Sequence, residues 1–279
     1  MTDAPELVRL NKALAQAGLC ARRKADELIF SGAVCVNGVV VTEPGRKICP
    51  GQDTIAVHGQ TLAAEQRKAC CLALHKPVRV VSTASDPEGR QTVLDLVPEA
   101  YADRRLYPVG RLDFFSEGLI LLTDDGELAN LLAHPRHHLP RRYEVHVRGS
   151  VPGRALERMR GGMTLAEGER LARAEVEVRP LGQDTLLTLT LHQGLNRQIR
   201  RMCRDLDLVV LRLVRVALGP LTLGDLPPGA ARPLTEQELA ALRRSVSPEA
   251  AQRSKKAPTP QRPRPERPSG TGRPSTRRR

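Results

Sequence analysis

A series of short apolar runs separated by glycine- and proline-rich turns limits the fold of this chain most strongly. Within the stretch 69–244, the runs lie at residues 70–74, 78–82, 106–109, 119–123, 143–147, 172–178, 185–192 and 208–216. Runs of this length between turn residues are typical of β-strands. Helical patterns are fewer, at 127–133, 154–160, 196–205 and 236–244. Many strands with a minority of helices predict an α+β domain, at 69–245, with a mainly antiparallel mixed sheet.

A smaller unit, residues 7–64, precedes this domain. Apolar residues recur there at i, i+3, i+4 and i+7, which predicts a helix ending at Gly18: Leu10, Ala13, Leu14 and Ala17. A second helix is expected over 21–31, ending at Gly32. Asn37-Gly38 lies between alternating apolar residues, and this dipeptide is the strongest short-range signal for a β-hairpin. The unit is therefore expected to contain two helices and a small sheet.

The last segment, 246–279, is of low complexity and strongly basic. It holds seven prolines and ten Lys and Arg, against two Glu. Such a composition cannot bury enough apolar surface to fold, so a disordered tail is expected. The tail either adds salt-sensitive RNA affinity or has no specific role. The whole chain has a net charge of +13, which makes polyanions the first candidate partners.

Composition also removes several function classes. The longest apolar runs are too short to cross a bilayer, so no membrane association is expected. The acidic N-terminus lacks the apolar segment of a secretory signal. Six cysteines form no Cys-x-x-Cys pair, which favours reduced core cysteines in the cytoplasm and no metal site. Cys70 and Cys71 are expected on opposite faces of a strand.

The N-terminal unit resembles the S4 RNA-binding domain over its whole length. The matching stretches are 10–18, 22–25, 28–29, 32–38 and 51–57, although Ala21 stands where such domains usually carry a Ser helix cap. Arg22, Arg23 and Lys24 open the second helix, where cations oppose the helix dipole. A phosphate partner would explain this arrangement, and a solvated charged face is the alternative. The resemblance favours RNA binding by these three residues.

The motif with the clearest chemistry lies in the larger domain. Asp113 is the single carboxylate within Gly110-Arg111-Leu112-Asp113-Phe114-Phe115-Ser116, and a buried apolar run follows it at 119–122. A carboxylate on a loop that leads into a buried strand is a candidate catalytic acid or nucleophile.

In this region the chain resembles the pseudouridine synthases, and among them the ribosomal subfamily that carries an N-terminal S4 domain. The resemblance covers nearly all of 69–244 and depends on the stretches 75–77, 86–93, 108–113, 116–130, 134–135, 142–143 and 194–202. Such enzymes cleave the N-glycosidic bond of a uridine, turn the base and rejoin it through carbon. The resemblance implies that no cofactor or metal is needed.

The resemblance also assigns roles to individual residues. It makes Asp113 the carboxylate beside the ribose, Tyr143 the active-site tyrosine and Arg200 the basic partner of Asp113. Arg111 is expected to position RNA phosphates or the catalytic loop. If 196–205 is helical, four arginines share one face: Arg197, Arg200, Arg201 and Arg204. This face could contact phosphates or a carboxylate, although Arg201 and Arg204 could instead belong to a solvated surface. Arg90 and Lys76 are further candidates for the same two roles, positioning RNA phosphates or the catalytic loop.

The chain departs from the family pattern at Phe114 and Phe115, where at least one polar residue is usual. These rings either pack the loop or offer a stacking surface for a splayed base. The target uridine must lie in a loop or be flipped out of a helix to reach Asp113.

The expected function is isomerisation of a specific uridine in rRNA. The motifs at 86–93 and 125–130 are most similar to the large-subunit, B-type enzymes that act on 23S rRNA. The alternatives are a 16S rRNA enzyme, a tRNA-directed synthase, and a non-catalytic RNA-binding factor in ribosome assembly. The substrate is expected to be rRNA or a precursor ribosomal particle, and the protein is expected to be a cytoplasmic monomer.

Overall fold

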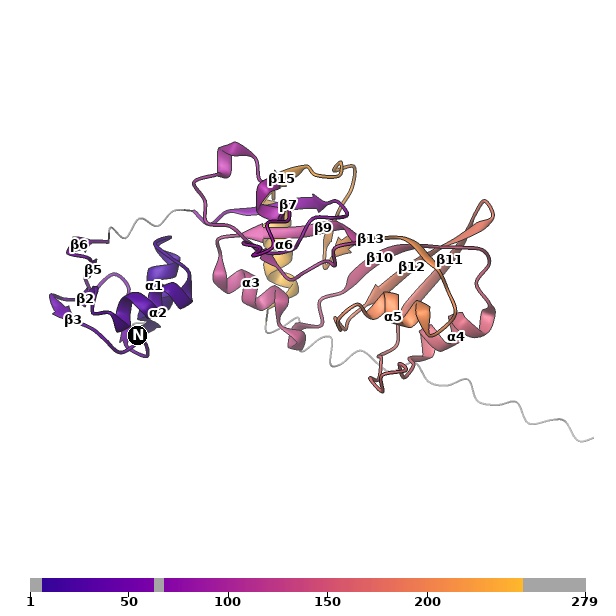
Figure 1. Cartoon of the computed structure of the whole chain (residues 1–279), viewed down its shortest axis with the longest axis horizontal. Helices are drawn as coiled ribbons and strands as arrows, with labels where there is room; N and C mark the ends of the chain where they lie inside the picture. The colour runs from indigo at the N-terminus through magenta and orange to yellow at the C-terminus, as the bar shows by residue number, and fades with distance from the viewer. Residues whose placement is uncertain (1–6, 63–67, 248–279) are drawn as a thin grey trace, which may run out of the picture.

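The computed structural model describes residues 7–62 and 68–247 (Figure 1). The basic tail expected from residue 246 lies outside the described residues, apart from its first two positions.

The N-terminal unit has the two expected helices and a small sheet. Helices α1 (Leu10–Gln16) and α2 (Arg22–Phe30) pack over the four-stranded sheet β3-β2-β5-β6. Its strands are β2 (Val34–Val36), β3 (Val39–Val40), β5 (Ile55–Val57) and β6 (Gln60–Thr61), and β1 (Val8–Arg9) pairs separately with β4 (Lys47–Ile48).

The predicted hairpin and the uncapped helix are both confirmed in this unit. Asn37 and Gly38 join β2 to β3 with φ of +50° and +78°, the backbone that a tight hairpin turn requires. Ala21 at the start of α2 offers no side-chain cap. The core is aliphatic because Leu10, Leu14 and Ile29 are completely buried.

The larger domain is built on one nine-stranded sheet. Seven strands follow the order β11-β12-β10-β13-β9-β7-β15, while β14 pairs with β13 and β8 pairs with β9. The strands are β7 (Cys71–Lys76), β8 (Tyr107–Val109), β9 (Glu117–Thr123), β10 (Arg141–Val147), β11 (Glu175–Leu181), β12 (Asp184–Leu191), β13 (Val210–Leu218), β14 (Leu221–Thr222) and β15 (Ala231–Pro233). The pairs are antiparallel except that β9 runs parallel to β13, so the predicted mixed sheet and α+β class are confirmed.

Helices cover different parts of the two sheet faces. Helices α4 (Gly153–Gly161) and α5 (Gln198–Arg204) share one hydrophobic core with β10 and β12, while α3 (Gly126–Ala133) and α6 (Glu236–Ser245) share another with β7 and β9. Short 3₁₀ turns occupy Val93–Leu96, Glu99–Tyr101 and Pro135–His137. Cys70 and Cys71 belong to different core clusters, so their predicted placement on opposite faces is confirmed.

The prediction of a strand over 78–82 is wrong. Val81 forms only an isolated bridge with Thr92, and Arg79 adopts a φ of +64°. Pro77 precedes this stretch and has no backbone N–H to donate to a ladder. The segment therefore follows a turn, and the backbone N–H of Arg79 donates to the carbonyl of Phe114, 2.7 Å away.

Gly118 allows β9 to approach β13 closely. Arg215 lies opposite it in the parallel ladder, and a Cβ placed on Gly118 would lie 2.4 Å from the Arg215 carbonyl oxygen and 2.5 Å from its nitrogen. The φ of Gly118 is +111°, which L side chains rarely adopt. Glycine at this position therefore joins the two halves of the sheet, directly after the loop that carries Asp113.

Candidate active site

Asp113 begins a tight turn that is held from several sides. The Ser116 N–H donates to the Asp113 carbonyl at 3.0 Å, which closes a four-residue turn. The hydroxyl of Ser82 donates to the Leu112 carbonyl at 2.8 Å and accepts from the Leu112 N–H at 3.1 Å. These bonds tie the loop to the 77–92 segment, so the Asp113 carboxylate projects from a fixed backbone.

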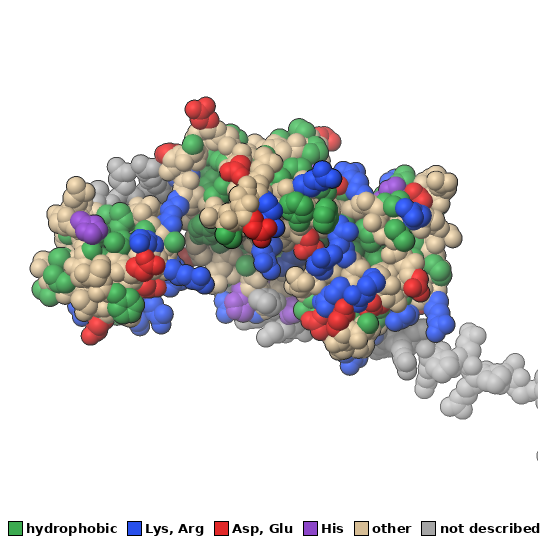
Figure 2. Space-filling model, viewed as in Figure 1, with side chains coloured by type: hydrophobic (Ala, Val, Ile, Leu, Met, Phe, Trp, Pro, Cys, Tyr) green, Lys and Arg blue, Asp and Glu red, His purple; other side chains and the backbone are tan. Residues whose placement is uncertain are grey.

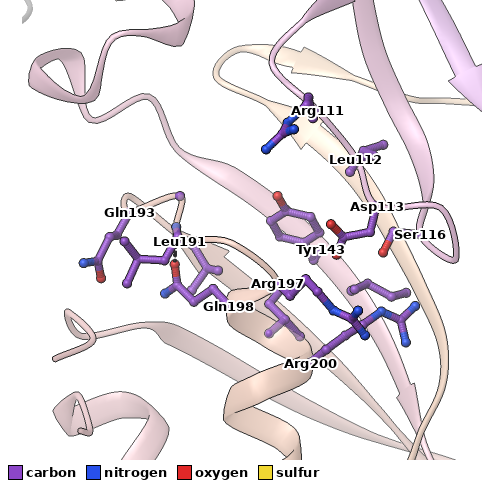
Figure 3. A pocket seen from close by; sticks show the side chains of 14 residues that line it. Arg111, Leu112, Asp113, Ser116, Tyr143, Leu191, Gln193, Arg197, Gln198 and Arg200 are labelled. Carbon is purple, nitrogen blue, oxygen red and sulfur yellow. Dashed lines mark hydrogen bonds between the residues drawn. The ribbon is translucent and has the colours of Figure 1, made fainter. Parts of the chain in front are cut away.

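The turn opens onto a pocket that contains the predicted site residues. Asp113 and Arg111 come from the loop, Tyr143 from β10, and Arg197 and Arg200 from the start of α5. Figure 3 shows the Asp113 carboxylate, the Tyr143 ring and the Arg200 side chain facing one space. The apolar part of the lining comes from Leu112, Leu191, Leu195, Ile199 and Leu213. Positions far apart in the sequence therefore meet around one carboxylate.

Tyr143 is placed by an irregularity in β10. The ladder between β10 and β13 shifts register between Arg142 and Tyr143, where Tyr143 lies opposite Arg215. Its ring is partly buried and packs against the two core clusters on the pocket side of the sheet. One face of an aromatic ring at the pocket wall is suited to stacking on a planar base.

Arg200 lies beside Asp113 without an ion pair between them in the described part of the chain. Its Nη2 donates to the Phe115 carbonyl at 2.6 Å, while its Nε is buried without a hydrogen-bond partner among the described residues. Burial lowers the pKa of the Arg200 guanidinium, and the Asp113 carboxylate opposes this shift. The expected proximity to Asp113 is present, but the direct pairing is not: Arg200 holds the turn that carries Asp113.

The four arginines that were expected to share one helix face separate into two pairs in the structure. Arg197, with a φ of +48°, and Arg200 line the pocket. Arg201 is ion-paired with Glu169, and Arg204 donates to Glu167 at 2.7 Å. Figure 2 shows acidic side chains next to basic ones on this face of the molecule. The Arg201 side chain is only 17% exposed, so its ion pair cannot be exchanged as readily as an exposed one, which argues against the expected RNA contact by Arg201.

Two buried cations lie close to the pocket. The side chain of Lys76 is completely buried, and its Nζ donates to the Pro77 carbonyl at 2.9 Å. Burial lowers the pKa of Lys76 to about 8, while the Asp113 and Glu117 carboxylates act in the opposite direction. Arg215, 3% exposed, donates from Nε to the Leu119 carbonyl at 2.7 Å. Both cations thus lie beneath the turn that carries Asp113 and donate to backbone carbonyls.

Two candidate RNA contacts are not available as expected. The burial of Lys76 prevents it from reaching a phosphate at the surface. Arg90 binds the Asp86 carboxylate through Nε and Nη2, at 2.9 and 2.8 Å. Lys76 is therefore not a surface phosphate contact, whereas Arg90 closes the 86–90 turn.

The cations of the S4-like unit remain at its surface. Arg22, Arg23 and Lys24 are exposed at the start of α2. Arg22 makes a long hydrogen bond of 3.5 Å to Asn11, and Lys24 pairs with Glu27 at 2.8 Å. The exposed Lys24–Glu27 pair contributes little stability, so Lys24 can exchange this partner for a phosphate.

Sequence reasoning assigned no role to several residues of the pocket. Gln193 and Gln198 line it, and Gln198 accepts from the Leu195 N–H at 3.2 Å. Ser116, 2% exposed, also lines the pocket, and its hydroxyl has no partner among the described residues. Ser116 and Gln198 belong to the matched motifs, but their burial depends on the tertiary fold.

In the described part of the chain, no group of three or more His, Cys, Asp or Glu side chains is placed to hold a metal. The helices of residues 7–62 and 68–247 include none that is long and apolar enough to cross a membrane.

Comparison with known proteins agrees with this architecture. The RNA pseudouridylate synthase family model matches residues 71–205, and the S4 domain model matches residues 8–53. An uncharacterized RNA pseudouridine synthase of Aquifex aeolicus is 40% identical, covering 86% of this chain and 95% of that protein. Ribosomal large subunit pseudouridine synthase B of Bacillus subtilis is 42% identical, covering 84% and 95%. A crystal structure of a pseudouridylate synthase superposes with a TM-score of 0.59 at 28% identity, covering 84% and 99%.

The fold and these matches define an RNA-modifying isomerase with an N-terminal S4 domain. The chain belongs to the RNA pseudouridine synthase family.

Proposed function

We propose that this protein converts a specific uridine of 23S rRNA to pseudouridine, with Asp113 as the catalytic carboxylate. The main support is the meeting of Asp113, Tyr143 and Arg200 around one pocket at the end of a braced turn. The name of the Bacillus subtilis relative, a large-subunit enzyme, supports the choice of rRNA.

The reaction is an isomerisation, so its atoms balance without a co-reactant. The bond from uracil N1 to ribose C1′ breaks, a bond from C5 to C1′ forms, C5 loses its proton to solvent, and N1 gains one. Asp113 acts at the ribose, Tyr143 stacks on the uracil, and Arg200 holds the Asp113 turn. The uridine has to leave its helix or loop stack to enter the pocket, which costs a few kcal/mol.

RNA contacts outside the pocket would offset this cost. Arg111 and Arg197 at the pocket are suited to phosphates near the target, and Arg22, Arg23 and Lys24 to more distant ones. We leave Arg201 out of this set because Glu169 already neutralises it. We further propose a cytoplasmic monomer that needs no cofactor and acts on rRNA or on a precursor particle.

The decisive experiment compares the wild type with Asp113→Asn. Because C5 loses its hydrogen, transcripts of 23S rRNA carrying [5-³H]uridine release tritium when modified. We expect Asp113→Asn to lower the rate by at least about 100-fold while RNA affinity stays within a few-fold. The control is Asp207→Asn, an exposed carboxylate with a φ of +58° that Asn also accepts.

Other outcomes would select other functions. Tritium release only from 16S rRNA would indicate a small-subunit enzyme, and release only from tRNA transcripts a tRNA-directed one. If the wild type bound rRNA but released tritium from no RNA, the protein would be an assembly factor.

A further inference from the structure

We propose that Phe115 stacks on a nucleobase next to the target uridine and so helps hold the RNA while that uridine occupies the pocket. This inference rests on the proposed function. It concerns a residue of the catalytic turn that lies outside the matched family motifs.

The position of Phe115 in the turn is unusual for a phenylalanine. Asp113 and Ser116 are the first and last residues of the turn, so Phe114 and Phe115 occupy its two central positions. Gly, Pro, Asn, Asp and Ser usually fill such positions, because they suit the turn backbone or hydrogen-bond to it, and a phenyl ring does neither. Phe114 is partly buried, but Phe115 is 60% exposed.

The backbone holds the Phe115 ring in this exposed position. The Phe115 carbonyl accepts from Arg200 at 2.6 Å, and the Phe114 carbonyl accepts from the Arg79 N–H at 2.7 Å. The two phenyl rings meet edge to face, with centroids 5.1 Å apart and an interplanar angle of 81°. The backbone of the turn is thus fixed at both phenylalanines, and the Phe114 ring packs against the Phe115 ring.

The turn also places Phe115 at the rim of the pocket. Asp113 and Ser116, on either side of the two phenylalanines, both line the pocket. Phe115 lies two positions after Asp113, so their Cα atoms are no more than about 7 Å apart. A nucleotide joined to the flipped uridine therefore passes within reach of the ring.

RNA is the partner that this surface fits. An exposed aromatic ring next to a pocket with cations suits a base with its phosphate, and Arg111, Arg197 and Arg200 line that pocket. Stacking is tolerant of base identity, so Phe115 is expected to contribute affinity and not sequence preference.

The test uses Phe115→Ala, Phe115→Leu and Phe115→Tyr in the full-length protein. Binding to a 23S rRNA transcript is measured by filter binding in an Asp113→Asn background, and turnover by tritium release in the active protein. We expect Ala to weaken binding and lower kcat/KM by about 5- to 100-fold, Leu to lose most of the same, and Tyr to stay near the wild type. Val178→Ala, another exposed apolar side chain (42%) on β11, is the matched control and should change neither quantity.

The result that overturns the proposal is Leu or Ala binding and reacting like the wild type. If Phe115→Leu had the RNA affinity and kcat/KM of the wild type, the ring would only cover apolar surface. If Phe115→Ala left both quantities unchanged, Phe115 would not contact RNA and would instead be exposed for a protein partner. Once the target uridine is mapped, RNAs with an abasic residue on one or the other side of it can be compared. For one of these RNAs, Phe115→Ala should bind almost as tightly as the protein with Phe115, because the base that stacks on the ring is missing. If the wild type releases no tritium from any RNA, the proposed function fails, and the binding series still decides the role of Phe115.

Discussion

Replacing Gly118 with Ala tests whether the contact between β9 and β13 holds the catalytic turn in place. The added Cβ would lie 2.4 Å from the Arg215 carbonyl oxygen, 2.5 Å from its nitrogen and 2.9 Å from its carbonyl carbon. All three are backbone atoms of a central strand, so no side chain can rotate away. The φ of +111° adds backbone strain for any residue with a Cβ.

The magnitude follows from these two effects. A non-glycine residue in a sparsely populated backbone region costs about 1–3 kcal/mol. Overpacking a tight contact adds about 1–3 kcal/mol. We therefore expect Gly118→Ala to lower the free energy of unfolding by roughly 2–6 kcal/mol, a large part of the 5–15 kcal/mol typical of a folded domain. Catalysis should fall even where the protein is folded, because Glu117 and Ser116 connect Gly118 directly to the Asp113 turn.

Urea unfolding followed by far-UV circular dichroism is a suitable assay, since the chain has no Trp. The control is Gly182→Ala in the turn between β11 and β12, where φ is +62° and no atom lies within 4 Å of the added Cβ. That variant isolates the positive-φ cost, about 1–2 kcal/mol. A Gly118→Ala protein as stable as Gly182→Ala, with full activity, would refute the idea that backbone contact with Arg215 positions the turn.

Three further predictions follow from the charges. Folding lowers the pKa of Lys76 from 10.5 to about 8, so between these pH values the unfolded chain binds more protons and the stability of the folded protein rises with pH. In urea unfolding, the free energy of unfolding of the wild type relative to Lys76→Met should increase by up to roughly 3 kcal/mol from pH 7 to pH 10.5. A constant difference between the two proteins would contradict this. The hydrogen-bonded Arg232 guanidinium lowers the pKa of Glu238 to about 2, so the stability that this pair contributes is present above the ordinary pKa of 4.5 and is lost as the pH falls toward 2. Glu238→Gln should therefore lower the free energy of unfolding by about 1–3 kcal/mol at pH 7 and by almost nothing near pH 2. Arg197→Ala should reduce the salt dependence of RNA binding by about one ion, whereas Arg201→Ala should leave it unchanged; equal slopes for the two variants would show that the ion pair with Glu169 does not decide which arginine meets phosphate.

Local signals in the sequence were sufficient for much of the fold. The Asn37-Gly38 hairpin, the two helices before it and most strands of the large sheet were predicted because each depends on neighbours within a few residues. The stretch 78–82 failed for the same reason: its apolar residues resemble a strand, while Pro77 and the turn at Arg79 prevent pairing. Order and identity of the motifs were also enough to name Asp113 and Tyr143, which share one pocket.

Local sequence patterns specify which chemical groups the protein carries and in which elements they lie, whereas the surroundings of each group depend on the segments that meet in the fold. The expected helical repeat grouped Arg197, Arg200 and Arg201 on one face, but α5 begins only at Gln198. Contacts with distant segments then separate the other two, because Arg200 binds the Phe115 carbonyl and Arg201 pairs with Glu169. The burial of Lys76 and the exposure of Phe115 likewise depend on which strands and loops surround them. These two kinds of information differ because the interactions behind them act over different distances along the chain. Backbone preference and periodicity act between near neighbours, whereas desolvation and charge pairing depend on segments that meet only after folding.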